Sequence, residues 1–228
     1  MVAGPSSVSG GIAGIGGRNS IVDYDSFYGS GRRIPSHELG HDLLLTHANL
    51  ISCNWVDITK IVDTCKIIEY GDNSDFMGGG SGINSNTNMY NRVLMGFYSE
   101  SLFINASTTV SGSYTLKDTH QVSGAFVTDS LALTFYFPEI YLGATSGGTY
   151  GGIASTNRYI IELWSGSGSC NVYVRIIFSK AASWFNKQAY RVGMLTIGQS
   201  FKDAINNVEF TFVEKDDLCL TAKILVKP

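Results

Sequence analysis

The sequence predicts an α+β protein in which a helix-bearing N-terminal part precedes an antiparallel β-sandwich. Two segments before residue 103 carry apolar residues at helical spacing. From residue 104 onward, short runs of alternating apolar and polar residues are separated by turn-forming Gly, Ser and Asn. We therefore expect two domains within the 228 residues, one covering residues 1–103 and the other residues 104–228.

The composition indicates a globular protein and excludes some classes of partner. Hydrophobic residues make up 44% of the chain and charged residues only 15%, which is enough apolar surface to bury a core. A net charge of −3 offers no basic surface for nucleic acid or for an anionic membrane. No apolar run reaches the roughly 18 residues of a membrane span. The first 17 residues also lack the charged and apolar regions of a signal peptide.

The N-terminal part should begin with short strands at residues 12–17 and 21–24, followed by a helix over residues 34–45. Pro35 suits the first turn of that helix, where its missing N–H leaves no hydrogen bond unmade. A second helix is expected within residues 84–97, because apolar residues recur there at helical spacing behind a polar cap.

The first predicted helix contains His-Glu-Leu-Gly-His at residues 37–41, and a third histidine follows at position 47. Residues i and i+4 share one helical face, so His37 and His41 can bind one metal ion with Glu38 beside them. His47 can be the third ligand if the chain turns sharply. Three ligands and one open position are typical of catalytic zinc, where a carboxylate deprotonates the zinc-bound water. Such a motif also arises by chance in amphipathic helices, but three of the four histidines fall within eleven positions here.

Four cysteines, none in a C-x-x-C pair, divide naturally into Cys53 with Cys65 and Cys170 with Cys219. The sequence allows three pairings, and four thiols in a reducing compartment are the alternative. Two disulfides favour an oxidising, extracellular environment. The Asn-Ala-Ser triplet that begins at Asn105 would then be a glycosylation acceptor.

Residues 69–80 form a turn-rich segment with the sequence Glu-Tyr-Gly-Asp-Asn-Ser-Asp-Phe-Met-Gly-Gly-Gly. A methionine is unusual there, because turns normally face water. Met77 is explained if its thioether forms an apolar floor beneath a site, although an ordinary buried methionine is the alternative.

These motifs together resemble the gametolysin-type metallopeptidases, which belong to the metzincin group of zinc proteases. The resemblance rests on H-E-L-G-H with its third histidine, a cysteine soon after, the E-Y-G-D-x-x-D-x-M-G segment and the short helix. It implies a partial metzincin-like catalytic domain, with Zn2+ held by His37, His41 and His47, Glu38 as general base, and Met77 in the Met-turn. It also implies a secreted endopeptidase whose substrates are proteins or glycoproteins of extracellular matrix or cell walls.

Two features depart from the family pattern. Metzincins have Gly at the position of Leu44, where a left-handed residue ends the helix and lets the third histidine return to the metal. A non-Gly residue in this conformation costs about 1–2 kcal/mol. Only 36 residues precede His37, whereas metzincins place a sheet and a helix before the zinc helix, so we expect a catalytic domain without its N-terminal part.

The C-terminal part should form the β-sandwich. Six alternating runs predict its strands, at residues 113–116, 132–137, 158–164, 171–178, 208–213 and 220–226. In the last run, Leu220, Ala222, Ile224 and Val226 should face the core. His120 falls in a loop and should be an ordinary surface or hydrogen-bonded histidine.

Two functions agree with these observations. The first is a zinc endopeptidase. The second is an inactive, protease-like remnant whose β-sandwich binds glycan or protein, which Leu44 and the short N-terminal part favour.

Overall fold

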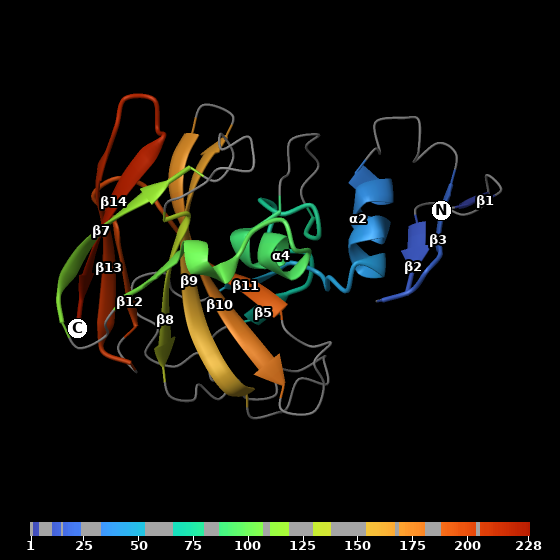
Figure 1. Cartoon of the computed structure of the whole chain (residues 1–228), viewed down its shortest axis with the longest axis horizontal. Helices are drawn as coiled ribbons and strands as arrows, with labels where there is room; N and C mark the ends of the chain where they lie inside the picture. The colour runs from blue at the N-terminus through green and yellow to red at the C-terminus, as the bar shows by residue number, and fades with distance from the viewer. Residues whose placement is uncertain are drawn as a thin grey trace.

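The computed structural model describes residues 2–4, 11–14, 16–23, 33–52, 66–79, 87–106, 110–118, 130–137, 154–166, 169–180, 188–203 and 206–228. The chain is mostly β-sheet, and its parts lie in a row (Figure 1). Two packed sheets occupy one end, helix α4 (Met89–Leu94) lies beside them, and helix α2 (Arg33–Asp42) with a small sheet occupies the other end. Cys53, Cys65 and His120 fall outside the described residues.

The larger sheet has seven strands in the order β5-β4-β11-β10-β9-β8-β6. Its strands are β4 (Asn49–Ser52), β5 (Lys66–Ile68), β6 (Phe103–Asn105), β8 (Ala132–Phe137), β9 (Ala154–Gly166), β10 (Ser169–Lys180) and β11 (Gln188–Leu195). Neighbouring strands are antiparallel except for β4 with β11 and β6 with β8. Strands from both sides of residue 103 therefore share one sheet, and the expected division between residues 103 and 104 passes through it.

The smaller sheet has four antiparallel strands in the order β12-β13-β14-β7. They are β7 (Gly112–Lys117), β12 (Ser200–Asp203), β13 (Val208–Lys215) and β14 (Thr221–Lys227). Alternate residues of β14 are buried, as predicted: Ala222, Ile224 and Val226 face the core. The same expectation is wrong for Leu220, which is exposed because it belongs to the turn before β14, where its N–H donates to Asp216 Oδ1.

The main core fills the space between these two sheets. Apolar side chains from both inner faces meet there; the rings of Phe135 on β8 and Phe210 on β13, for example, have centroids 4.7 Å apart. The predicted Cys170–Cys219 disulfide is confirmed, with a Cα–Cα distance of 5.7 Å, and it ties β10 to the turn before β14. In the chain-entropy model, closing a loop of this length stabilises the fold by about 4 kcal/mol.

The opposite face of the seven-stranded sheet carries helix α4. Met89 and Tyr90 of this helix pack against Ile160 of β9 and Ile177 of β10. Asn88 caps the helix, since its side chain accepts a hydrogen bond from the N–H of Asn91. A 3-10 turn (Glu100–Leu102) then leads into β6. The second predicted helix is therefore present but ends at Leu94, before the expected limit.

The N-terminal end consists of a three-stranded sheet and helix α2. The strands are β1 (Val2–Gly4), β2 (Gly11–Ala13) and β3 (Ser20–Asp23), in the order β1-β3-β2. Helix α2 contacts β2 and β3. Its predicted C-terminal limit at Leu45 is wrong, because the helix ends at Asp42. No helix among the described residues is both long enough and apolar enough to cross a membrane.

Candidate metal centre

Helix α2 ends in a hydrogen-bonding pattern that turns the chain back. The N–H of Leu44 donates to the carbonyl of His41 (3.0 Å), and the N–H of Leu45 donates to that of Gly40 (2.9 Å), which together form a Schellman motif. Leu44 has a φ of +72°, the left-handed conformation that the motif requires. The sharp turn expected after His41 is therefore present, and it leads into the segment that carries His47.

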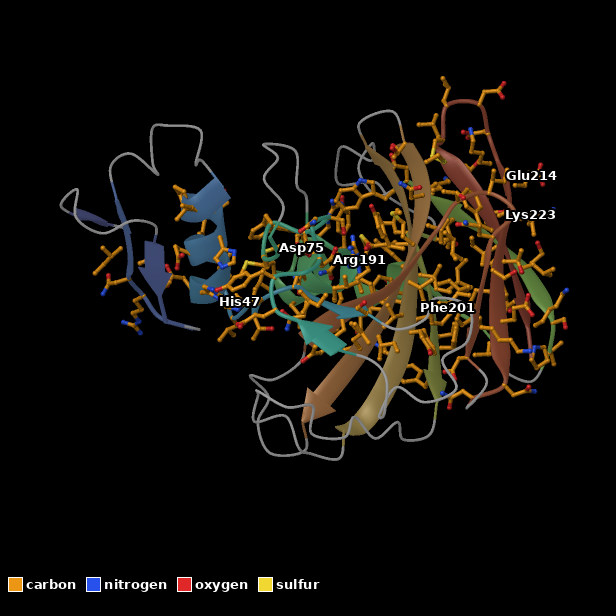
Figure 2. The ribbon with its side chains drawn as sticks, turned by 180° about the vertical axis from the view of Figure 1, so that it is seen from behind. His47, Asp75, Arg191, Phe201, Glu214 and Lys223 are labelled. Atoms are coloured by element: carbon orange, nitrogen blue, oxygen red, sulfur yellow. A yellow bond between two sulfur atoms is a disulfide. The ribbon has the colours of Figure 1, made fainter. Side chains whose placement is uncertain are left out.

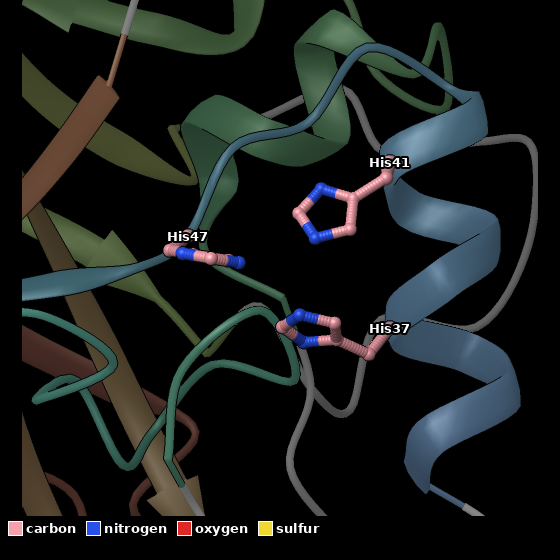
Figure 3. Close-up of side chains that lie close together, drawn as sticks. All are labelled: His37, His41 and His47. Carbon is pink, nitrogen blue, oxygen red and sulfur yellow. The ribbon is translucent and has the colours of Figure 1, made fainter. Parts of the chain in front are cut away.

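The three histidines converge beside this turn. His37 and His41 project from α2, His47 projects from the following segment, and all three rings point into a common space (Figure 3). The ring centroids are 4.7 Å (His37–His41), 5.3 Å (His37–His47) and 4.9 Å (His41–His47) apart. One ligand nitrogen from each ring lies within 4.8 Å of the other two, so the three residues could hold a metal ion.

Hydrogen bonds determine which ring nitrogen carries the proton. Each Nδ1 faces an oxygen that accepts: the carbonyl of Phe76 for His37 (3.0 Å), the carbonyl of Leu45 for His41 (2.9 Å) and Oε1 of Glu69 for His47 (2.7 Å). Because these oxygens accept, we assign the proton of each neutral ring to Nδ1. The lone pair is then on Nε2, which is the arrangement of metal-binding histidines whose other nitrogen donates to an outer acceptor.

An apolar layer supports the histidine-bearing helix. Met77 is completely buried and packs with Leu45 and Ala48. Gly40, which lies between the two helical histidines, approaches Met77 and Phe76 so closely that a Cβ at this position would overlap both side chains. Met77 thus lies directly against α2, as a floor for the site requires, and its role as the methionine of a Met-turn stays a prediction.

Glu38 lies beside the histidines with only 6% of its surface exposed. Burial raises the pKa of its carboxyl, Asp42 raises it further, and His41 and a backbone hydrogen bond from Ala13 act in the opposite direction. A carboxyl whose pKa is raised toward neutrality exchanges protons more readily near pH 7 than an exposed glutamate does. This environment suits the predicted general base.

Glu69 and Tyr70 also lie at the site, although neither was predicted to be a site residue. Glu69 accepts the hydrogen bond from His47, and the ring of Tyr70 lies against the imidazole of His47 at a centroid distance of 3.8 Å. Burial lowers the pKa of His47 despite the opposing effect of Glu69, which favours the neutral ring that a metal needs. Tyr70 has a φ of +58°. The sequence signal was present, since both residues open the E-Y-G-D segment.

Two further expectations concern Asn105 and the pair Cys53 and Cys65. Asn105 ends strand β6 with an exposed side chain, so glycosylation there stays a prediction. The expected Cys53–Cys65 disulfide concerns residues outside the described part of the chain. Comparison of the chain with protein-family models, with curated proteins and with solved structures gives no match. The case for function therefore rests on the site itself.

Proposed function

We propose that this chain is a zinc-dependent endopeptidase whose metal is held by Nε2 of His37, His41 and His47. The observation that carries the proposal is the set of three Nδ1 hydrogen bonds to Phe76, Leu45 and Glu69. Each bond selects the tautomer that directs an imidazole lone pair from Nε2, and the three rings converge. Histidines that only fill a core have no reason to share this arrangement.

The donor set fits zinc. Imidazole nitrogen is a preferred zinc ligand, and sites with three protein ligands leave one position for a reactant. Imidazole also suits copper, nickel and iron, but carboxylates complete the iron sites of many enzymes and none is among the three converging groups. Burial lowers the pKa of His47, which favours the neutral form of this ring that binds metal.

Glu38 is the general base in this proposal. Zinc, when bound, supplies Lewis-acid chemistry that polarises a peptide carbonyl and acidifies water. The Glu38 carboxylate takes a proton as the water attacks the peptide carbon, and later delivers it to the leaving amine. Burial raises the pKa of Glu38, which favours its holding the proton between the two transfers. Protein or glycoprotein substrates outside the cell agree with the Cys170–Cys219 disulfide.

A second candidate is the inactive remnant, in which the β-sandwich binds glycan or protein. The observation in its favour is Leu44, which holds a left-handed conformation that costs a non-Gly residue about 1–2 kcal/mol. This cost opposes the return of His47 to the metal, and it would weaken the zinc site without preventing the fold.

The test measures zinc content and hydrolysis of a generic protein substrate in the same preparations. We expect Glu38→Ala to abolish hydrolysis while zinc is retained, and His37→Ala with His41→Ala to remove zinc as well. His120→Ala, which alters the one histidine outside the motif, serves as the matched control and should change neither. Full hydrolysis in Glu38→Ala, or undiminished zinc in the double variant, would reject the proposal. Zinc binding without hydrolysis in the wild-type protein would favour the remnant.

A further inference from the structure

Arg175 is a completely buried arginine on the face of the seven-stranded sheet that is turned away from the sandwich core. Its neighbours Val174 and Ile176 point into the core between the sheets, so the alternation of β10 directs Arg175 to the other side. Nε of Arg175 donates to Glu162 Oε1 on β9 (2.6 Å). The two Nη groups of the guanidinium contact the loop formed by residues 71–79, which is distant in the sequence.

Both Nη groups bind residues in the first half of the 71–79 loop. Nη1 of Arg175 pairs with Oδ2 of Asp72, and Nη2 donates to Oγ of Ser74 (2.9 Å). Asp72 in turn accepts hydrogen bonds from the backbone and the hydroxyl of Ser74 (3.1 and 2.5 Å). Burial works against the charge of Arg175, but Asp72 and Glu162 raise its pKa above the usual range, so the guanidinium stays charged.

The second half of the same loop supports the metal centre. The carbonyl of Phe76 accepts the hydrogen bond from His37 Nδ1, and Met77 packs against Gly40 of α2. The carbonyl of Met77 also accepts from the N–H of Ala48, which directly follows His47 (2.9 Å). The loop therefore touches both segments that carry ligands, and it is held from behind by a strand about a hundred residues away in the sequence.

The sheet is irregular at this arginine. The register between β10 and β11 shifts between Val174 and Arg175, so that Val192 of β11 has no paired partner in the ladder. A β-bulge of this kind bends the strand and re-aims side chains, and bulges are frequent beside functional sites. On β11, Arg191 lies near Asp75 of the same loop (Figure 2). Its Nη1 is 3.3 Å from Asp72 Oδ1.

We propose that Arg175 is a positioning residue of the metal centre, which holds the 71–79 loop so that Phe76 and Met77 keep the ligand-bearing segments in place. The inference deepens the proposed zinc site and rests on it. Because Arg175 belongs to β10, the sandwich is a structural part of the site in this proposal. A sandwich that served as an independent binding module would have no need to hold this loop through a buried ion pair.

The test compares Arg175→Lys with Arg158→Lys in the full chain. Lysine keeps the positive charge but replaces a planar fork that donates in three directions with a single ammonium. Arg158 is a matched control because it is also nearly buried and lies on the same sheet face, whereas its hydrogen bonds go to Glu100 and Tyr136. Each variant is measured for Zn2+ affinity by competition with a chelating dye, for the visible spectrum of bound Co2+, and for melting temperature.

We expect Arg175→Lys to weaken Zn2+ binding by about tenfold or more, the usual effect of losing outer-shell support, and to change the Co2+ spectrum. Arg158→Lys should lower the melting temperature without altering affinity or spectrum. Equal Zn2+ affinity in Arg175→Lys and wild type would overturn the inference, as would an equal loss in both variants. If Arg175→Lys does not fold, Asp72→Asn removes the same ion pair from the loop side while keeping an acceptor for Ser74, and the same outcomes apply.

A separate measurement distinguishes this inference from the proposed function. Hydrogen exchange in the metal-free protein should show faster exchange at the amides of Ala48 and Gly78 and along α2 in Arg175→Lys, with no such change in Arg158→Lys. A wild-type protein that binds no Zn2+ would refute the proposed function alone. Unchanged exchange at these amides in Arg175→Lys would refute the inference that Arg175 positions the histidine-bearing segments through the loop, whether or not the protein binds Zn2+.

Discussion

Leu44 occupies the position where the family pattern has Gly and where the chain turns left-handed beside the histidines. The expected Gly is absent, yet the chain adopts the left-handed turn that Gly would favour and completes both hydrogen bonds of the Schellman motif. The packing of Leu45 beneath the turn and the bond from His41 to its carbonyl hold this conformation. The side chain of Leu44 is 40% exposed, so its burial offsets little of the strain of the left-handed conformation.

Leu44→Gly should therefore stabilise the helix end. Removing the left-handed strain is worth about 1–2 kcal/mol, which exceeds the entropy cost of Gly at a position that already requires positive φ. We expect tighter zinc binding and a higher melting temperature, measured by zinc titration and calorimetry. Weaker binding with a lower melting temperature would mean that the apolar contacts of Leu44 outweigh its strain.

Substitution of Glu69 tests whether its hydrogen bond with His47 supports metal binding. Its carboxylate fixes the ring of His47 from a position that is largely exposed, so its removal should leave the fold intact. Glu69→Ala should weaken zinc binding about 10–100-fold, and Glu69→Gln, which keeps an acceptor, should weaken it less.

The control for this prediction is Glu214→Ala, which removes a similarly exposed carboxylate whose partner, Lys223, lies on the far side of the molecule (Figure 2). Zinc affinity should be unchanged in that variant. Equal affinities of Glu69→Ala and wild type would show that Glu69 does not orient His47.

At the scale of elements, Asp75 connects the 71–79 loop to helix α4. Its Oδ2 accepts hydrogen bonds from the backbone N–H of Asn88 (2.8 Å) and the hydroxyl of Thr87 (3.2 Å), and its Oδ1 accepts from the N–H of Met77 (2.8 Å). One carboxyl thus connects the backbone of Met77, below the candidate metal site, to the start of helix α4. Position 75 stands out in the sequence only as part of a turn-rich segment.

The pH dependence of stability should reveal this buried carboxyl. Burial and the charge of Asp72 raise the pKa of Asp75 to about 6. Because the folded state then holds the proton more tightly than the unfolded state, the stability gained from protonated Asp75 is present at low pH and is lost as the pH rises through about 6. The free energy of unfolding of the wild type, relative to the non-titrating Asp75→Asn, should fall between about pH 4 and about pH 7.

Urea denaturation of both metal-free proteins across this range measures the difference. A difference that is constant, or that grows with pH, would show that the donors around Asp75 hold it ionised in the folded state.

Elements with strong local signals were predictable, and elements defined by distant partners were not. The helix with His37 and His41, the alternation of β14 and the two longest strands, β9 and β10, follow from periodicity, whereas β11 was not predicted. Strands β4 and β5 have only four and three residues, and they exist as strands because β4 pairs with β11, some 140 residues further along the chain. No local pattern encodes such a pairing.

In the whole molecule, the part of the site that could be predicted is the part that one short segment of sequence encodes. The proposed ligands His37, His41 and His47 were predicted from spacing within a short segment, and these three residues lie close together in the structure. The support comes from elsewhere: Arg175 and Glu162 belong to the sandwich, and their burial opposite Asp72 depends on the complete fold. A buried Arg with two carboxylates is also a pattern that sequence alone cannot distinguish from surface charges.

The most direct test of the proposed zinc centre is X-ray absorption at the zinc edge of the protein loaded with one equivalent of Zn2+. We expect three imidazole ligands and one further nitrogen or oxygen, with metal–ligand distances of about 2.0–2.1 Å and no sulfur. Loss of one imidazole in His47→Ala should be visible in the same spectrum. Sulfur scattering, fewer than three imidazoles in the wild type, or an unchanged spectrum in His47→Ala would contradict it.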